Sequence, residues 1–96
     1  MGRLRLAPAA KSDLDAIWDY TAGRWDAAQA EHYVQSLTQS LQLLADRPGI
    51  GHSIEDIRPG YRKFAVAAHV VFYRQTEAGI DVIRILHKSM DVERHL

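Results

Sequence analysis

Residues 61–87 read YRKFAVAAHVVFYRQTEAGIDVIRILH, and this stretch decides the fold. It contains three runs typical of β-strands, Tyr61–Phe64, His69–Arg74 and Ile80–His87, each with an arginine among apolar or aromatic residues. Short connections between the runs predict antiparallel neighbours in a three-stranded meander. Because a strand points alternate side chains to opposite faces, one face can seal a core while the other gathers charge. A basic, aromatic-lined sheet on a small protein indicates a surface that meets a larger partner.

The segment before the meander predicts a short strand followed by a helix. Residues 3–6 alternate polar and apolar side chains, which is typical of a half-buried strand. A helix can begin at Pro8, which suits a first turn, or at Ser12, which suits an N-cap. The helical spacing of the apolar residues predicts one buried stripe, which consists of Leu14, Ile17, Trp18 and Trp25. Both tryptophans are therefore predicted to lie in the core.

A second helix is predicted from an N-cap at Asp26 to about Ala45. Pro48 and Gly49, which follow soon after Ala45, prevent it from continuing. Its apolar stripe consists of Ala30, Tyr33, Val34, Leu37, Leu41 and Leu44. The link between the helices is very short, so they should form an antiparallel hairpin that covers one face of the sheet. The predicted order is β-α-α-β-β-β, an α+β fold with a helical hairpin packed on a small, mainly antiparallel sheet.

Length and composition limit the classes of protein that this chain can represent. Its 96 residues predict one domain, 1–96. The chain has no cysteine, which excludes disulfides and thiolate chemistry. Net charge is zero but uneven, because residues 1–57 hold five Lys/Arg against eight Asp/Glu and residues 58–96 hold seven against four. No signal peptide or membrane span is visible, so a cytoplasmic location without membrane contact is expected.

Groups for catalysis or metal binding are not clustered in the sequence. The five histidines are scattered and include no HExxH motif or paired spacing on one helix face. Aspartates of the first helix are explained by the helix dipole and by solvation. No glycine-rich phosphate loop or GxSxG motif is present. We therefore expect no catalytic residue, metal or cofactor.

The arginines of the three strands form the candidate partner-binding set. Arginine stays charged and binds carboxylate or phosphate with a planar fork. Arg84 lies in an otherwise apolar strand, so it needs solvent, an anionic partner or an internal acid such as Asp91. Strand parity sends Arg84 and His87, three positions apart, to opposite faces unless a bulge intervenes. The predicted contact residues are Arg62, Arg74, Arg84, His87, Met90, Asp91, His95 and Leu96.

Beyond these patterns, the chain resembles ParE-type toxins of the RelE/ParE superfamily of bacterial toxin–antitoxin modules. The resemblance covers nearly the whole chain in the right order. Its motifs are Asp13–Tyr20 with Trp25, Gln29-Ala30 and Tyr33 in the helices, then Pro48–Gly51, Arg58–Arg62, His69–Arg74 and Arg84–Asp91.

This resemblance implies a partner and a target. The protein would be neutralised by an antitoxin of the ParD type, or of another family, whose C-terminal segment wraps the toxin in a hetero-oligomer. Family members of the ParE type trap DNA gyrase on cleaved DNA, which is inhibition by binding without turnover. Nucleic acid would then be met indirectly, through gyrase or through the operator that the antitoxin binds.

RelE-type relatives provide the alternative function, because they cut messenger RNA in the ribosome. Such members carry lysines in the region before and within the second strand and a tyrosine late in the chain. Here residues 51–57 contain no lysine, and no tyrosine follows Tyr73. These departures favour the gyrase interpretation over a ribosome-dependent endoribonuclease. A toxin-like binding module that has lost activity is the third interpretation.

Overall fold

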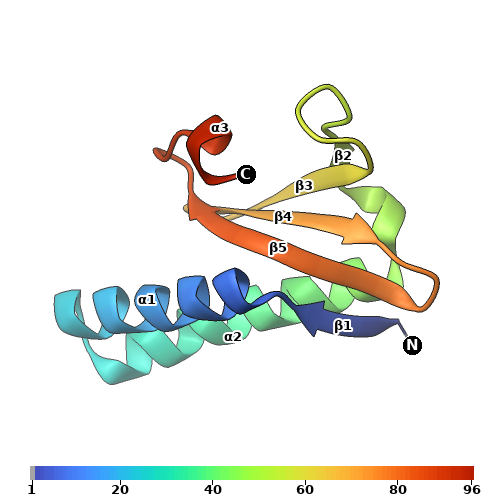
Figure 1. Cartoon of the computed structure of the whole chain (residues 1–96). Helices are drawn as coiled ribbons and strands as arrows, with labels where there is room; N and C mark the ends of the chain where they lie inside the picture. The colour runs from blue at the N-terminus through green and yellow to red at the C-terminus, as the bar shows by residue number, and fades with distance from the viewer. Residues whose placement is uncertain (1) are drawn as a thin grey trace.

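In a computed structural model, which describes residues 2–96, two long helices cover one face of a five-stranded sheet (Figure 1). The strands follow the order β1-β5-β4-β3-β2 across the sheet. Their bounds are Arg3–Leu6, His52–Ser53, Tyr61–Val66, His69–Gln75 and Gly79–His87 for β1 to β5. The predicted order β-α-α-β-β-β is confirmed. The structure adds the two-residue strand β2 and two short helices, the 3-10 helix η1, Pro48–Ile50, and the C-terminal helix α3, Val92–His95.

The sheet is mixed because its first strand runs parallel to its last. β1 pairs with β5 in parallel, from Arg3 opposite Gly79 to Leu6 opposite Val82. β2 to β5 pair antiparallel, as the short connections predict. Gly79 allows this close approach, since a Cβ there would lie 2.0 Å from the carbonyl oxygen of Arg3. The parallel pair brings the first strand to the edge of the sheet, beside the start of the last one.

The helical hairpin consists of α1, Pro8–Arg24, and α2, Ala27–Asp46. Pro8 occupies the first turn of α1, where its missing N–H is not needed. The side chain of Asp26 caps α2 by accepting a hydrogen bond of 2.7 Å from the backbone N–H of Gln29. Among residues 2–96, no helix combines the length and the apolar character needed to cross a membrane.

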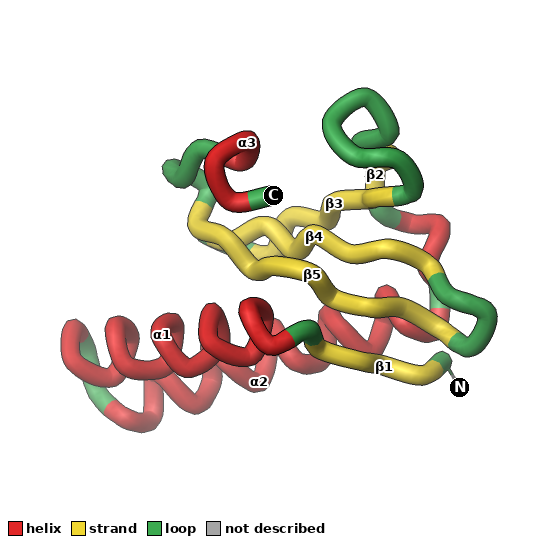
Figure 2. The backbone as a smooth tube through the Cα atoms, viewed as in Figure 1, coloured by secondary structure: helices red, strands yellow, loops and turns green. Residues whose placement is uncertain are grey.

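The main core lies between the helical hairpin and the inner face of the sheet, which is the face that the hairpin covers (Figure 2). Helical spacing on α1 and α2 and the two-residue period of the strands bring their apolar side chains together. The buried members of this core are Ala10, Ile17, Leu37, Leu41, Leu44, Ala45, Val71, Tyr73, Ile80, Val82 and Ile85.

The outer face of the sheet carries a second, smaller apolar cluster. Ile54, Phe72 and Leu86 are buried there. A short C-terminal helix, α3, spans Val92–His95 and covers this cluster with Val92 and Leu96 (Figure 1). Residues 92–96 therefore pack on the fold, and the two faces of the sheet are covered by very unequal layers.

The position of the tryptophans corrects the sequence prediction. Trp18 is 38% exposed and Trp25 is 60% exposed, so neither belongs to the core. The buried face of α1 consists of Ala10, Ile17 and Thr21. Trp18 follows that face by one position, and Trp25 lies near the α1–α2 connection, where the hairpin extends past the strands (Figure 1). An apolar spacing pattern identifies a stripe but not how far the sheet extends beneath it.

Candidate functional site

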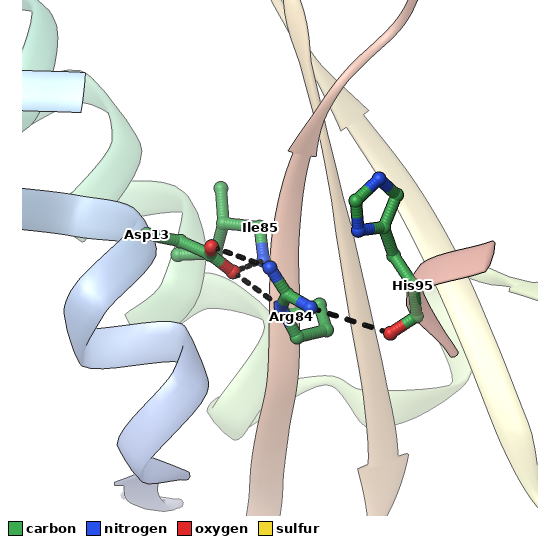
Figure 3. A network of polar contacts seen from close by, with 4 residues as sticks. All are labelled: Asp13, Arg84, Ile85 and His95. Carbon is green, nitrogen blue, oxygen red and sulfur yellow. Dashed lines mark hydrogen bonds and ion pairs between the residues drawn. The ribbon is translucent and has the colours of Figure 1, made fainter. Parts of the chain in front are cut away.

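Arg84 of β5 is bound inside the fold and joins three elements (Figure 3). Its Nε and Nη2 donate to the two carboxylate oxygens of Asp13 on α1, each at 2.8 Å. Its Nη1 donates to the backbone carbonyl of His95 in α3 at 3.3 Å. Asp13 also accepts a hydrogen bond of 2.9 Å from the backbone N–H of Ile85. This N–H lies in the part of β5 that extends past its pairing with β1. The Arg84 side chain is 23% exposed, and all three of its nitrogens are engaged.

The internal acid that Arg84 requires is therefore Asp13, 71 residues away in the chain, and not Asp91. The bidentate hydrogen bonds that Arg84 donates to Asp13 raise the pKa of the guanidinium above its usual value. Asp91 instead caps α3 by accepting a hydrogen bond from the backbone N–H of Glu93. A contact between residues so distant in sequence leaves no local signal that could have identified it.

Arg62 of β3 and Tyr73 of β4 hold the loop that follows α2. Arg62 donates from Nη2 to the carbonyls of Gly51 at 2.7 Å and Gly49 at 3.1 Å. The buried Tyr73 hydroxyl donates to the Pro48 carbonyl at 2.7 Å and accepts from the Gly51 N–H at 3.0 Å. Gly51 is required there, because a Cβ would lie 2.2 Å from the Tyr73 hydroxyl oxygen. These contacts give Arg62 a structural task within the chain.

Arg74 is the most accessible of the three predicted arginines. Its side chain is 55% exposed, and it shares the carboxylate of Asp81 with Arg5 of β1. The distances from the guanidinium nitrogens to Oδ2 of Asp81 are 3.2 Å for Arg74 and 3.7 Å for Arg5. One acid thus lies between two cations on the outer face.

The predicted tail residues have different environments. Met90 is exposed, whereas Leu96 packs on the outer apolar cluster. The Leu96 carbonyl accepts from the Arg58 guanidinium, and the His95 carbonyl accepts from Arg84. The tail is therefore fastened through its backbone, which leaves Met90 as its main exposed apolar side chain.

A groove of about 610 Å³ opens between the far end of the helical hairpin and the end of the sheet. Its apolar and aromatic lining comes from both helices and their connection, from the start of β4 and the turn before it, and from β5 and the turn after it. The lining includes Ile17, Tyr20, Trp25, Tyr33, Ile85 and Met90. Tyr20, Trp25 and Met90 are exposed on it. Large exposed apolar side chains around a concave surface are typical of a protein-binding groove.

The comparisons with known proteins agree with this geometry. A family model described as "ParE toxin of type II toxin-antitoxin system, parDE" matches residues 4–92. The chain belongs to the ParE toxin family. Both the groove and the outer face lie within the matched segment, apart from Arg3 of β1 and residues 93–96.

Two curated relatives cover nearly the whole ParE chain. A protein named Toxin ParE1 from Mycobacterium tuberculosis is 47% identical over 95 residues, 98% of this chain and 97% of its own length. Another Toxin ParE1, from Caulobacter vibrioides, is 44% identical over 92 residues, 96% of this chain and 95% of its own. A solved structure titled "Chromosomal ParDE TA system from P. aeruginosa" matches the fold with a TM-score of 0.77 at 24% identity, covering 91% of this chain and 96% of that one.

The ParE fold also brings together histidines that look scattered in the sequence. His69 of β4 and His87 of β5 are cross-strand partners with ring centroids 5.3 Å apart. Nδ1 of His69 shares a hydrogen bond of 2.7 Å with the Tyr33 hydroxyl. Burial, followed by the nearby His87, lowers the pKa of His69 below its usual value. The sequence did not reveal this pair because the register between β4 and β5, which places residue 69 opposite residue 87, was not known from it.

The prediction that strand parity separates Arg84 from His87 is confirmed. Arg84 is opposite Phe72, a member of the outer cluster. His87 is opposite His69 and lines the groove on the helical side. A bulge precedes both residues, since Ile83 has no partner between the Tyr73–Val82 and Phe72–Arg84 pairs. The bulge shifts the register upstream and leaves the relative facing of Arg84 and His87 unchanged.

Proposed function

We propose that this ParE-family chain is a toxin that inhibits DNA gyrase by binding and is neutralised by a ParD-like antitoxin. The observation that carries the antitoxin interaction is the apolar groove between the hairpin and the sheet. Membership of the toxin family supports the assignment of the activity. Because gyrase acts on the chromosome, this function takes place in the cytoplasm.

The groove has the chemistry that an amphipathic helix requires. Ile17 and Ile85 form an apolar floor, and Tyr20 and Trp25 stand exposed beside it. A helix that lays its apolar face into such a groove buries large aromatic side chains, which contribute most of the binding energy at many interfaces. Among the described residues that line the groove, Arg24 is the one arginine or lysine, and its charge favours an acidic residue on the helix.

A second contact by strand addition is open at the edge of the sheet. β1 is one of the two edge strands and, within residues 2–96, pairs with β5 alone, so the backbone groups on its other side are available to an extended peptide. An antitoxin segment that continues from the groove along this edge would cover both features. The expected complex is a toxin–antitoxin hetero-oligomer.

Binding, and not RNA cleavage, is supported by the state of the arginines. Stabilising the phosphorane of a cleavage reaction requires cationic groups free to face it. Arg84 is instead engaged by Asp13, and Arg62 by the carbonyls of Gly49 and Gly51. These internal contacts favour a toxin that acts by docking.

The target is tested with the purified chain in two parallel assays. The first incubates it with gyrase and supercoiled plasmid, and the expected result is accumulation of cleaved DNA. The second adds it to translating ribosomes, and messages should stay intact. Message cleavage without stabilised gyrase–DNA breaks would contradict the proposal and support a RelE-type endoribonuclease. Absence of both effects and unhindered growth on expression would identify an inactive binding module.

The antitoxin groove is tested with a matched pair of tryptophan variants. Trp25→Ala should weaken binding of the cognate antitoxin at least tenfold in a calorimetric titration, because Trp25 lines the groove. Trp18→Ala is the control, since Trp18 is a second exposed tryptophan, on α1, that does not line the groove. Equal losses for the two variants would locate the antitoxin elsewhere.

A further inference from the structure

We propose that the outer face of the sheet binds the phosphate backbone of duplex DNA directly, through four cations carried by three strands. These are Arg3 and Arg5 of β1, Lys63 of β3 and Arg74 of β4, and they are called the basic rows below. This goes beyond toxin activity and departs from the expectation that nucleic acid is met indirectly. The four residues are brought to one surface by the strand register alone.

The register defines the first of the two rows. Arg5 is opposite Asp81, Asp81 is opposite Arg74, and Arg74 is opposite Tyr61, so four neighbouring strands contribute one side chain each. Opposite residues on neighbouring strands point to the same face. The contacts from Asp81 to both arginines agree with this arrangement.

The second row lies one step along the strands. Arg84 is opposite Phe72, Phe72 is opposite Lys63, and Lys63 is opposite His52. Lys63 and His52 are exposed, whereas Arg84 is held by Asp13. Lys63 is a diagonal neighbour of Arg74, and such neighbours lie about 7–8 Å apart. Lys63 therefore extends the positive charge across the sheet.

The basic rows carry an excess of positive charge that the chain as a whole lacks. With Arg84 left out because Asp13 neutralises it, four strand cations face one strand carboxylate, Asp81, which gives a formal balance of +3 on the strands of this face. The surrounding loops and α3 hold three bases, Arg58, Lys88 and Arg94, and five acids, Glu55, Asp56, Glu77, Asp91 and Glu93. Glu55 accepts a hydrogen bond from the Gly60 N–H, and Asp91 caps α3, so these two serve local structure.

Spacing and mobility suit a duplex. Three strand intervals separate β1 from β3, which corresponds to about 14 Å at the usual spacing between strands. This distance is comparable to the width of about 12 Å of the major groove, so cations at the two ends can reach phosphates on both of its sides. Arg5 and Arg74 are largely exposed although they share Asp81, so they can exchange that carboxylate for a phosphate. Contacts of this kind carry no sequence preference.

The test measures binding of the isolated chain to a fluorescein-labelled 20-base-pair duplex by anisotropy at several salt concentrations. With about three phosphates neutralised, the logarithm of the association constant should fall with the logarithm of salt with a slope of about −2.7. The test variant replaces three cations of the basic rows by Arg5→Gln, Lys63→Gln and Arg74→Gln. Its salt slope should be less steep than about −1, and its binding should be at least tenfold weaker.

The matched control removes three charges from the helical layer instead. Lys11→Gln, Arg24→Gln and Arg47→Gln change the net charge equally, and these residues are also exposed. This control variant should keep the salt slope within about 0.5 of the original. Equal loss in both triple variants would show that the duplex senses only net charge, which would overturn the proposal.

A gain of binding provides the second test, because a misfolded variant cannot produce it. Asp81→Asn removes the acid between Arg5 and Arg74 while it keeps the size of the side chain. Binding to the duplex should tighten about threefold or more. Unchanged or weaker binding, or no detectable binding of the original chain at 20 mM salt, would overturn the proposal. None of these results depends on gyrase, so the proposed inhibition stands or falls separately.

Discussion

The two faces of the sheet differ in what covers them, although the same strands supply both. The inner face is covered by α1 and α2, which bury eleven core residues with it. The outer face is covered by the four-residue α3 and by Ile54 of the loop after β2, and its cluster buries three residues. On the inner face the strands contribute the buried side chains of Val71, Tyr73, Ile80, Val82 and Ile85, whereas on the outer face they carry exposed cations. Stability is therefore concentrated on one side and accessible charge on the other.

Two arginines of the outer face show the same difference at the level of single residues. Arg84 lies at the edge where α1 and β5 meet, and Asp13 and the His95 carbonyl bind it. Arg74 lies in the open part of the face and shares one carboxylate with Arg5. The residue type and the strand period are alike, so the covering layer decides which arginine is structural and which is accessible.

The largest expected effect comes from the inner core. Leu41→Ala should reduce the free energy of unfolding by about 4 kcal/mol, because Leu41 is 1% exposed and the surrounding layers cannot collapse into the cavity. Leu86→Ala on the outer face should cost about 2 kcal/mol, since the short α3 can settle into the space. Urea denaturation measures both. Leu43→Ala, on the same helix but 43% exposed, is the control and should cost less than about 1 kcal/mol.

Equal costs for Leu41→Ala and Leu86→Ala would contradict the comparison of the two faces. The outer cluster would then be supported as firmly as the inner core.

The next effect concerns the junction between the faces. Asp13→Ala should reduce the free energy of unfolding by about 2–3 kcal/mol, because it leaves the Arg84 guanidinium and the Ile85 N–H without their acceptor. The same denaturation experiment measures it. Asp15→Ala is the control, since Asp15 is exposed on the same helix, and it should change stability by less than about 0.5 kcal/mol. Similar values for the two variants would mean that Arg84 does not need Asp13.

A smaller effect is expected where the inner face meets the loop after α2. Tyr73→Phe should cost about 1–2 kcal/mol, because the Gly51 N–H and the Pro48 carbonyl lose a buried partner. Thermal unfolding should show a corresponding fall in Tm. Tyr20→Phe removes an exposed hydroxyl that bonds only to Arg24 and should have little effect. An unchanged Tm in Tyr73→Phe would show that water replaces the hydroxyl in the loop.

The smallest effect concerns His69, at the groove end of the inner face. Its pKa is lowered mainly by burial and then by His87, so the folded state holds the proton less firmly than the unfolded chain does. Its contribution to stability is therefore complete above the unfolded pKa of about 6.5 and is lost as the pH falls below it. NMR titration should give a pKa for His69 below 6.5. His87→Gln should raise that value, whereas His52→Gln, on β2, should leave it unchanged.

A pKa of His69 at or above 6.5 would contradict the described burial. An identical shift in the two glutamine variants would show that proximity to His87 is not the cause.

Periodicity in the sequence predicted most of the fold. The β-type run in residues 69–74 and the helical spacing of Leu37, Leu41 and Leu44 correspond to β4 and to the buried face of α2. These patterns succeed because each element buries its own apolar side chains whatever its partner is. The periodicity does not show where the sheet beneath the helices ends. Trp18 and Trp25, which are exposed, were therefore wrongly predicted as core residues.

The candidate sites depended more on tertiary structure. The sequence identified Arg74 and Met90, which are exposed, but it did not separate them from Arg62 and Arg84, which are engaged inside the chain. The groove was invisible because its lining comes from both helices, β5 and a turn. The sequence predicted a strand that contains Arg3 and Arg5 but no contact surface there. The parallel pairing of β1 with β5 brings these residues to the same face as Arg74.

The sequence by itself determined the elements of this ParE-family chain and the inward or outward side of most residues, because both follow from the repeat of helix and strand. Only the tertiary structure decided which charges are neutralised. That outcome depends on contacts such as the one between Asp13 and Arg84, which lie far apart in the chain and meet through the packing of α1 against β5. The periodicity of a helix or strand does not indicate which distant acid will pair with a partly buried arginine such as Arg84.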